Sequence, residues 1–368
     1  MPALDWITIE GFKSIASMKR VRLTPVNLII GANGSGKSNF VSAFSFLNTL
    51  RESNLQTFVK ASGGANRILH FGAKTTATLR FEISFGDEVN QYEIDLIPTD
   101  DDSLVPFQEL CSFWNKHYPS PYNTGLEAIG LEAGISGKQS QKVASYVRGH
   151  LDRWRLYHFH DVGRFSPMKK SAPIDDNRAL RQDGSNLASF LYLLREKHQP
   201  SYALIRSSIQ AVAPFFDDFV LEPRSLESDQ IRIEWRHKGS NDYFDVSAFS
   251  DGTLRFIALA TLFLQPFALR PSVIIVDEPE LGLHPYAIAK LASMVKSASS
   301  QTQIILSTQS ALLLDHFNPE DVLVADRVNG GTVLTRLDAN KWNEWLEEYS
   351  LGQLWEKAEF GGRPGDAT

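Results

Sequence analysis

The stretch VNLIIGANGSGKS, from Val26 to Ser38, places a nearly continuous apolar run directly before a glycine-rich loop. The loop fits the pattern G-x-x-x-x-G-K-[ST] in full, and apolar residues at helical spacing follow it over residues 38–50. In this strand–loop–helix context, backbone N–H groups at the helix N-terminus wrap a β-phosphate. We therefore predict a nucleotide-binding loop, and ATP as its ligand, made of Gly31, Ala32, Asn33, Gly34, Ser35, Gly36, Lys37, Ser38 and Asn39.

A second motif, VIIVDEPE, follows much later in the chain, over residues 273–280. Its four apolar residues place Asp277 at the carboxyl end of a buried strand, where ligands bind in open α/β sheets. We predict that Asp277 and the Ser38 hydroxyl hold Mg²⁺, and that Glu278 deprotonates the attacking water. The alternative is an ordinary acidic turn after a core strand, and Glu280 fits a solvated loop equally well.

A third motif, FSDGTLRF, occupies residues 249–256, and its serine lies 27 residues before Asp277. One apolar helix, TLRFIALATLFL, fills most of that gap. A serine and a glycine at a helix N-terminus form an anion site. Because the first loop already holds the β-phosphate, this site is free to meet the γ-phosphate of another subunit. The residues concerned are Ser250, Asp251, Gly252 and Thr253; the alternative is a simple helix cap by Ser250 or Asp251.

The order of GFKSI, GANGSGKSN, FSDGTLRF, VIIVDEPELGLHP and STQS resembles that of the stand-alone ATPases of the ABC class, which are related to the SMC, RecF and OLD-type ATPases. The resemblance spans nearly the whole chain. It implies an α/β P-loop NTPase fold: an ABC-type head with an antiparallel β subdomain and a helical insertion. It also implies ATP-dependent dimerisation, with Ser250 and Gly252 acting in trans, and a role in DNA maintenance or in defence against foreign DNA.

Two positions depart from the family pattern. Many ABC ATPases have a histidine after the last core strand, where STQS has Gln309. An amide can hydrogen-bond a γ-phosphate or the water but carries no charge, and the alternative is an ordinary polar strand end. A glutamine often starts the helical lobe, where LYHFHD offers His160 or Asp161; a satisfied interior histidine is the alternative. His284, in LGLHP, either contacts the opposite site or caps the helix beginning at Pro285.

The pattern of elements suggests four segments. Residues 1–98 form an N-terminal ATPase lobe with the loop, and 99–215 form a helical insertion. Residues 216–340 form a C-terminal ATPase lobe, and 341–368 form a helical tail. Within the first segment, TATLRFEISF and QYEIDLI predict an antiparallel hairpin. Helices are expected between the polar stretches TDDDS and GISGKQSQ.

Composition limits the functional classes. The chain has 368 residues, 43% of them hydrophobic, and a net charge of −6, so there is no overall basic signature for nucleic acid. Residues 142–181 carry nine basic against four acidic side chains, which fits internal salt bridges and solvated faces better than a phosphate-binding surface. A single cysteine, Cys111, excludes a disulfide framework. Without a signal-peptide pattern or an apolar run of membrane-spanning length, we expect a cytoplasmic protein that does not contact membranes.

These observations predict a Mg²⁺-dependent ATPase that works as a switch by forming a homodimer around ATP. The alternative is a nucleotide-sensing module that regulates a separate effector protein, such as a nuclease, with incidental hydrolysis. DNA is a candidate partner. A fused nuclease is disfavoured, because only 58 residues follow Ser310.

Overall fold

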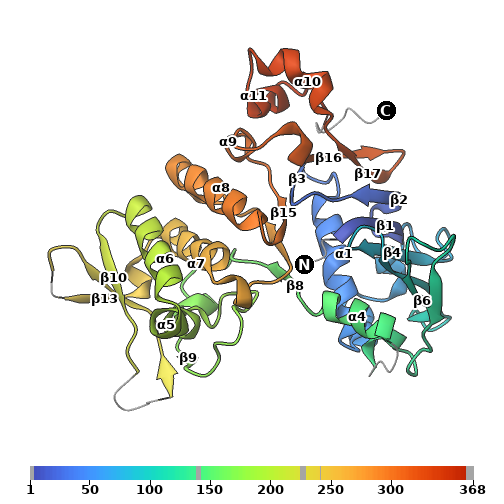
Figure 1. Ribbon diagram of the computed structural model, residues 1–368, viewed down its shortest axis with the longest axis horizontal. Coiled ribbons are helices and arrows are strands. Elements are labelled where there is room, and N and C mark those ends of the chain that lie inside the picture. The colour runs from blue at the N-terminus through green and yellow to red at the C-terminus, as the bar shows by residue number, and fades with distance from the viewer. Residues whose placement is uncertain (1–3, 138–141, 224–228, 241, 362–368) are drawn as a thin grey trace.

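The computed structural model describes residues 4–137, 142–223, 229–240 and 242–361 (Figure 1). Its central element is a six-stranded sheet in the order β17-β16-β3-β15-β14-β8. All neighbours are parallel except the final hairpin of β16 and β17. The strands are β3 (Val26–Ile30), β8 (Trp154–Tyr157), β14 (Val273–Asp277), β15 (Gln303–Ser307), β16 (Val322–Val328) and β17 (Gly331–Arg336).

A second, antiparallel sheet has the order β2-β1-β4-β5-β6-β7. The predicted hairpin is confirmed in β4 and β5, but the helices expected after residue 103 are wrong, because β6 and β7 extend the sheet there. The α/β class with an antiparallel subdomain therefore holds, while that subdomain is larger than predicted. Its strands are β1 (Leu4–Phe12), β2 (Ile15–Arg22), β4 (Leu79–Phe85), β5 (Asn90–Pro98), β6 (Leu104–Phe113) and β7 (Tyr122–Gly125).

The central sheet separates two hydrophobic cores, because successive side chains of a strand point to opposite faces. In β14, Ile275 belongs to the core shared with the antiparallel sheet, whereas Ile274 and Val276 belong to the other core. The long helix after the glycine-rich loop, α1 (Lys37–Arg51), fills the first core with Phe40, Phe44 and Phe46 among others. Shorter helices complete that lobe: α2 (Leu55–Ala61), α3 (Ala65–Ile68) and α4 (Lys142–Leu151).

Helices cover the other face of the central sheet and form a separate lobe (Figure 1). The predicted helical insertion is present as α5 (Leu187–Lys197) and α6 (Gln199–Val212), which pack near α7 (Asp251–Leu264) and α8 (Pro285–Ser299). Small sheets border them: β10 (Phe216–Val220) with β12 (Glu234–His237) and β13 (Tyr243–Asp245), and β9 (Ala172–Pro173) with β11 (Gln230–Ile231).

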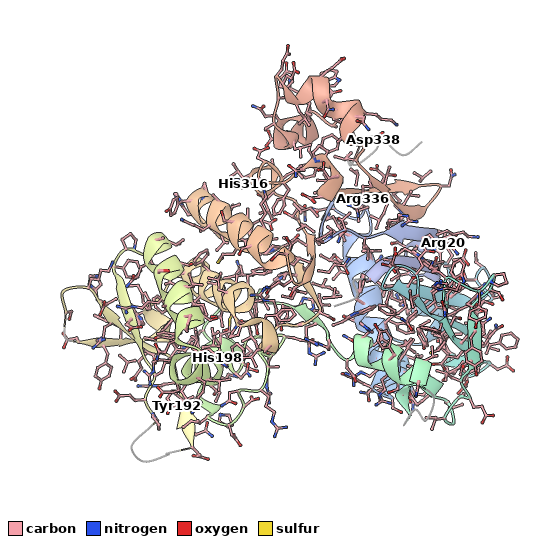
Figure 2. All side chains as sticks on the ribbon, in the orientation of Figure 1. Arg20, Tyr192, His198, His316, Arg336 and Asp338 are labelled. Atoms are coloured by element: carbon pink, nitrogen blue, oxygen red, sulfur yellow. The ribbon has the colours of Figure 1, made fainter. Side chains whose placement is uncertain are left out.

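The C-terminal helices α9 (Ala311–Leu314), α10 (Ala339–Leu346) and α11 (Leu351–Glu356) lie beyond the edge of the central sheet (Figure 1). Arg336, labelled in Figure 2, ties this end to the first lobe. Its guanidinium donates to the carbonyls of Arg22 and Glu320 and to Asn27 Oδ1. Among the described residues, no helix has the length and apolar character needed to cross a bilayer.

Candidate nucleotide site

The carboxyl ends of three adjacent parallel strands bring the first two motifs together. β3 leads into the glycine-rich loop, β14 into Glu278 and β15 into Gln309. A cavity of about 220 Å³ opens where they meet. It is lined by Asn33, Gly34, Gly36, Lys37, Ser38, Asn39, Glu278 and Gln309. Residues more than 240 positions apart in the chain thus face one space of the size of a phosphate cradle.

The glycine-rich loop has a backbone conformation that requires glycine at position 36. Gly36 precedes α1 with a φ of 104°, and a Cβ at this position would overlap the Thr332 side chain. The Ser35 hydroxyl is buried and, among the described residues, has no hydrogen-bond partner. A buried orphan donor in a loop of backbone N–H groups at a helix N-terminus suits an anionic ligand. The loop therefore fits a nucleotide phosphate.

Lys37 is the buried cation of the site. Its Nζ donates to the carbonyls of Gly31, at 2.6 Å, and Ala32, at 3.0 Å. Burial lowers the pKa of Lys37, although the charges of Glu278, Asp277 and Glu280 oppose that shift. The loop carbonyls and the facing carboxylates together keep the ammonium in place beside the cavity.

Glu278 has an unusual backbone and a direct side-chain partner. Its φ is 42°, which is rare for a residue with a side chain and costs on the order of 1–3 kcal/mol. Its N–H donates to the Ser307 carbonyl at 2.7 Å, so the bent backbone is fixed to the next strand. Gln309 Nε2 donates to Glu278 Oε1 at 2.6 Å. The two predicted catalytic side chains are therefore in direct contact.

Glu280 is not the solvated loop residue that the sequence allowed. Its Oε1 accepts hydrogen bonds from the Thr308 hydroxyl, at 2.6 Å, and from the Gln309 N–H, at 3.3 Å. Burial raises its pKa, and its Oε2 is buried without a partner among the described residues. Both donors follow the end of the neighbouring strand β15, and the sequence carried no signal that they reach this carboxylate.

The predicted metal ligands are Ser38, which lines the cavity, and Asp277, which ends β14 and does not line it. No cluster of three or more His, Cys, Asp or Glu side chains suited to a metal occurs within the described ranges. Mg²⁺ commonly takes one or two protein ligands and completes its shell with water and substrate phosphates. A hydroxyl and one carboxylate beside a phosphate cradle fit that mode.

The third motif lies at the start of α7 and away from this cavity. None of Ser250, Asp251, Gly252 and Thr253 is among its lining residues. Ser250 caps the helix by accepting the Thr253 N–H at 3.2 Å, so the local capping role is present. Asp251 pairs with Lys169 at 3.5 Å. Within one chain, this motif does not meet the glycine-rich loop.

Arg255, which the sequence analysis did not select, joins three segments around the site. It is buried in α7, and its guanidinium donates to the carbonyls of Phe159, at 2.9 Å, and His160, at 3.1 Å, and to that of Leu281. The loops after β8 and β14 are thereby tied to the start of α7. The only sequence signal was one arginine in an otherwise apolar helix.

The predicted histidines have different surroundings. His160 is exposed, and its Nε2 lies 2.8 Å from the Asp277 carbonyl oxygen, so it reaches the end of the β14 strand. It is therefore not an interior histidine. Asp161 is exposed, and its Oδ1 accepts the Gly163 N–H at 3.3 Å. His284 caps α8 by accepting the Tyr286 N–H at 3.3 Å, which was one of the two alternatives for it.

With this geometry established, comparison with known proteins assigns the family. The family described as "AAA domain, putative AbiEii toxin, Type IV TA system" matches residues 26–315, from β3 through α9. The chain belongs to this family. The match includes the glycine-rich loop, the α7 start and the acidic strand end.

Solved structures of SMC heads share the fold. The SMC head bound to the C-terminal winged-helix domain of ScpA superposes with a TM-score of 0.62 at 16% identity, covering 92% of this chain and 99% of that one. The head with an extended coiled coil bound to the C-terminal domain of ScpA, derived from Pyrococcus furiosus, gives 0.62 at 16% identity, covering 95% and 99%. The chain therefore has the fold of an SMC-type P-loop ATPase head.

Two curated proteins share part of the sequence. Urease accessory protein 2 of Cryptococcus neoformans var. grubii is 39% identical over 266 residues, or 63% of this chain and 21% of that protein. Structural maintenance of chromosomes protein 3 of Arabidopsis thaliana is 36% identical over 92 residues, or 24% of this chain and 7% of that protein. The chain thus spans about a fifth or less of the length of these relatives.

Proposed function

We propose that this protein binds ATP with Mg²⁺ and hydrolyses it in a site completed by a second copy of the chain. The observation that carries the proposal is the shared cavity, in which Lys37 and Ser38 face Glu278 and Gln309. A phosphate cradle and an acid–amide pair on opposite walls are what the attack of water on a terminal phosphate requires.

Each side chain has a role in this proposal. Lys37 binds the β- and γ-phosphates, while Ser38 and Asp277 hold Mg²⁺, which neutralises charge on the transferring phosphate when bound. Glu278 accepts the proton of the attacking water. Gln309 donates to Glu278 in the structure and is positioned to orient the same water. His160 is a nucleotide-binding residue in this proposal, which its position 2.8 Å from the Asp277 carbonyl oxygen supports.

Dimerisation through ATP is supported by what one chain lacks. The anion-binding start of α7 is exposed at Ser250 and Asp251, yet it does not reach the cavity of its own chain. Large apolar side chains are also exposed in the segments that follow the carboxyl ends of the strands. They are Phe165, Leu281, Tyr286 and Leu312, which are 78%, 48%, 50% and 50% exposed. A second head placed on this face would bury them and supply Ser250 to the γ-phosphate.

The hydrogen bond between Gln309 and Glu278 favours slow turnover as part of the function. It occupies one carboxylate oxygen of the base, at 2.6 Å, while the neutral amide cannot add charge to the site. Hydrolysis then requires this pair to separate or rotate towards water. A protein that hydrolyses ATP slowly stays in its ATP-bound state long enough to signal to a partner. The alternative function, a nucleotide-sensing module that regulates a separate effector, is supported by the same hydrogen bond between Gln309 and Glu278.

The names of the relatives support a proposal for the biological setting. One curated relative is named for the maintenance of chromosomes, and the matched family is named for a toxin of a toxin–antitoxin system. Both fit a head that acts near DNA, either in its maintenance or in defence against foreign DNA. ScpA in the related structures shows that such heads bind other proteins, which makes a separate effector a candidate partner here.

Glu278→Gln tests the proposal. The amide keeps the size of the side chain but cannot accept the proton of water, so we expect steady-state hydrolysis to fall by about 10²- to 10⁴-fold with ATP binding retained. Light scattering after size exclusion should show an ATP-bound dimer. Glu344→Gln, an exposed carboxylate on α10, is the matched control and should behave as wild type. Wild-type turnover of Glu278→Gln would exclude Glu278 as the base.

Protein concentration separates the two candidate functions. Specific activity that rises with protein concentration indicates hydrolysis between two copies. Tight retention of ATP by a monomer, without turnover, would indicate the sensing module instead.

A further inference from the structure

Two adjoining cavities lie along the open edge of β8, apart from the nucleotide cavity. β8 is the last strand of the central sheet, between the two lobes (Figure 1). One cavity, of about 530 Å³, is lined by residues 179–183 with Arg155 and His158. The other, of about 220 Å³, is lined by residues 152–153, 178–179 and 268–271 with Arg155. Arg155 and Ala179 belong to both, so the two form one groove, here called the β8 groove.

The lining of the β8 groove is strongly basic for a protein of net charge −6. Its charged members are two aspartates, Asp152 and Asp183, and five arginines: Arg153, Arg155, Arg178, Arg181 and Arg270. Asp152 is already engaged, because Arg51 Nε lies 2.6 Å from its Oδ1. The groove therefore concentrates positive charge that its own wall does not neutralise.

Three of the five arginines, Arg153, Arg155 and Arg270, donate to backbone carbonyls. Arg155 donates to the carbonyls of Asp152 and Trp154, both at 2.7 Å, and Arg153 donates to the Arg270 carbonyl at 3.2 Å. Within the described ranges, no ion pair joins Arg153, Arg155, Arg178 or Arg270 to a carboxylate. Only Arg181 has one, with Asp176 at 2.8 Å. The interpretation of residues 142–181 as internal salt bridges and solvated faces holds for Arg181, which is exposed and paired, but Arg153 and Arg155 are partly buried without an ion pair among the described residues.

Arg270 supplies a buried donor to the wall of the groove. Its Nη2 donates to the Gln265 carbonyl at 2.7 Å, while its Nε is buried without a partner among the described residues. Burial lowers the pKa of Arg270, and no nearby acid opposes that shift. A buried guanidinium N–H without an acceptor is costly and is ordinarily satisfied by a ligand, an ion or water.

We infer that the β8 groove is a second phosphate-binding site, which takes several phosphate groups in series. Guanidinium groups match phosphate oxygens in geometry and in charge. The groove has room for more than one phosphate, and its five arginines are divided between the two cavities, with Arg155 in both. This chemistry is shared by a free polyphosphate and by the backbone of a nucleic acid.

The lining also predicts whether binding depends on the nucleotide sequence of the ligand. Among the described residues, the groove lining has no Phe, Tyr or Trp on which successive bases could stack, and its charged groups are suited to phosphates rather than to base edges. Binding should therefore be independent of sequence, and a duplex should bind at least as well as a single strand. The inference rests on the proposed role near DNA only for the source of the phosphates, and not on ATP hydrolysis.

The experiment uses Lys37→Ala protein without ATP, so that the nucleotide cavity does not bind the probes. Fluorescence anisotropy follows labelled 24-base-pair duplexes of two unrelated sequences and one single strand of each, and calorimetry follows sodium tripolyphosphate. Arg178→Glu, on the exposed rim, and Arg155→Gln, on the shared wall, are compared with Arg67→Glu, an exposed arginine of α3 outside the groove. Circular dichroism confirms that each variant is folded.

We expect each groove variant to weaken binding equally for all duplex sequences and to reduce the slope of log K against log salt by about one, with Arg67→Glu unchanged. Binding of DNA with this pattern assigns the source as nucleic acid; binding of tripolyphosphate alone assigns it as a small polyphosphate. The inference is overturned if neither probe binds, or if both groove variants bind like Arg67→Glu. Those results would leave the ATPase proposal intact, because Glu278→Gln tests it separately.

Discussion

At the scale of single residues, the nucleotide cavity is organised by charge that is buried before any ligand arrives. Lys37 is held by two loop carbonyls, and the carboxylates of Glu278 and Asp277 are near enough to act on its pKa. A phosphate entering this space would bring anionic oxygens to the same ammonium. The lysine is thus pre-positioned, so little rearrangement is needed when the ligand binds.

Lys37→Ala should abolish tight ATP binding. Removal of the ammonium deletes a charge-assisted hydrogen bond to phosphate, worth about 1.5–3 kcal/mol, which corresponds to roughly a ten- to hundred-fold loss in affinity. Calorimetric titration with ATP measures it. Lys13→Ala is the control, because Lys13 is also partly buried and bonds Ser42 on α1, at 2.9 Å, but does not line the cavity. Equal affinity for the two variants would remove the phosphate-loop assignment.

The residue scale also marks the limit of sequence reasoning. The chain order of motifs was enough to place Lys37 and Glu278 at one site, because strand carboxyl ends meet at one edge. Glu280 and Arg255 could not be assigned in this way. Their roles depend on the hydroxyl of Thr308 and on carbonyls of residues 159–160 and 281, which only the folded chain brings within reach.

At the scale of elements, β6 is a strand in a segment for which the sequence predicted helices. Its segment LVPFQELCSF has Leu104, Phe107 and Leu110 at a spacing of three, which is typical of a helix. In the structure Phe107 is 70% exposed while Leu104 and Cys111 are buried, and the whole segment pairs with β5. A shift in register near Leu96 accommodates Pro106. Pairing with an existing sheet edge overrode the local pattern, as tertiary context often does.

One carboxylate fixes this sheet to the loop before α4. Glu109, 4% exposed, accepts hydrogen bonds from the Tyr92 hydroxyl, at 2.9 Å, and from the N–H groups of Gly134, at 2.6 Å, and Ile135, at 2.8 Å. Burial raises its pKa, and these three donors act against that shift. The carboxylate thus joins β5, β6 and the turn that follows β7.

Glu109→Ala should destabilise the first lobe markedly. Three donors lose this acceptor in a buried setting, and at about 1–3 kcal/mol for each buried group left unsatisfied, we expect the free energy of unfolding to fall by roughly 3 kcal/mol or more. Urea denaturation followed by circular dichroism measures it. Glu127→Ala, an exposed carboxylate of the same region, should change stability by less than about 0.5 kcal/mol. If Glu109→Ala lowers the free energy of unfolding by no more than Glu127→Ala does, water replaces the carboxylate as the acceptor of these hydrogen bonds.

At the scale of the whole molecule, the central sheet decides which parts can act together. The nucleotide cavity lies at the carboxyl ends of its strands, and α7 begins on the helical lobe beyond them. Arg255 ties α7 to the loops after β8 and β14, so a displacement of the start of α7 is transmitted to the end of β14. Docking of a second head on this face would therefore affect the nucleotide cavity.

A test of that dimer needs a variant that disturbs only the contact between chains. Gly252 is unsuitable, because a Cβ there would overlap the Gly282 carbonyl oxygen of the same chain. Ser250 is exposed, and aspartate caps helices about as well as serine. Ser250→Asp therefore keeps the start of α7 intact and places a negative charge where the γ-phosphate of the partner would dock.

Ser250→Asp should bind ATP through its own loop but fail to dimerise or hydrolyse, because like charges repel strongly in a dry interface. Ser250→Ala, without the added charge, is the matched control and should retain more activity. Mixing Ser250→Asp with Lys37→Ala protein gives dimers in which one site joins an intact loop to an intact α7 start. Partial activity should then return from two inactive proteins. Normal hydrolysis by Ser250→Asp alone would reduce the motif to a helix cap and remove the main support for a site shared between two chains.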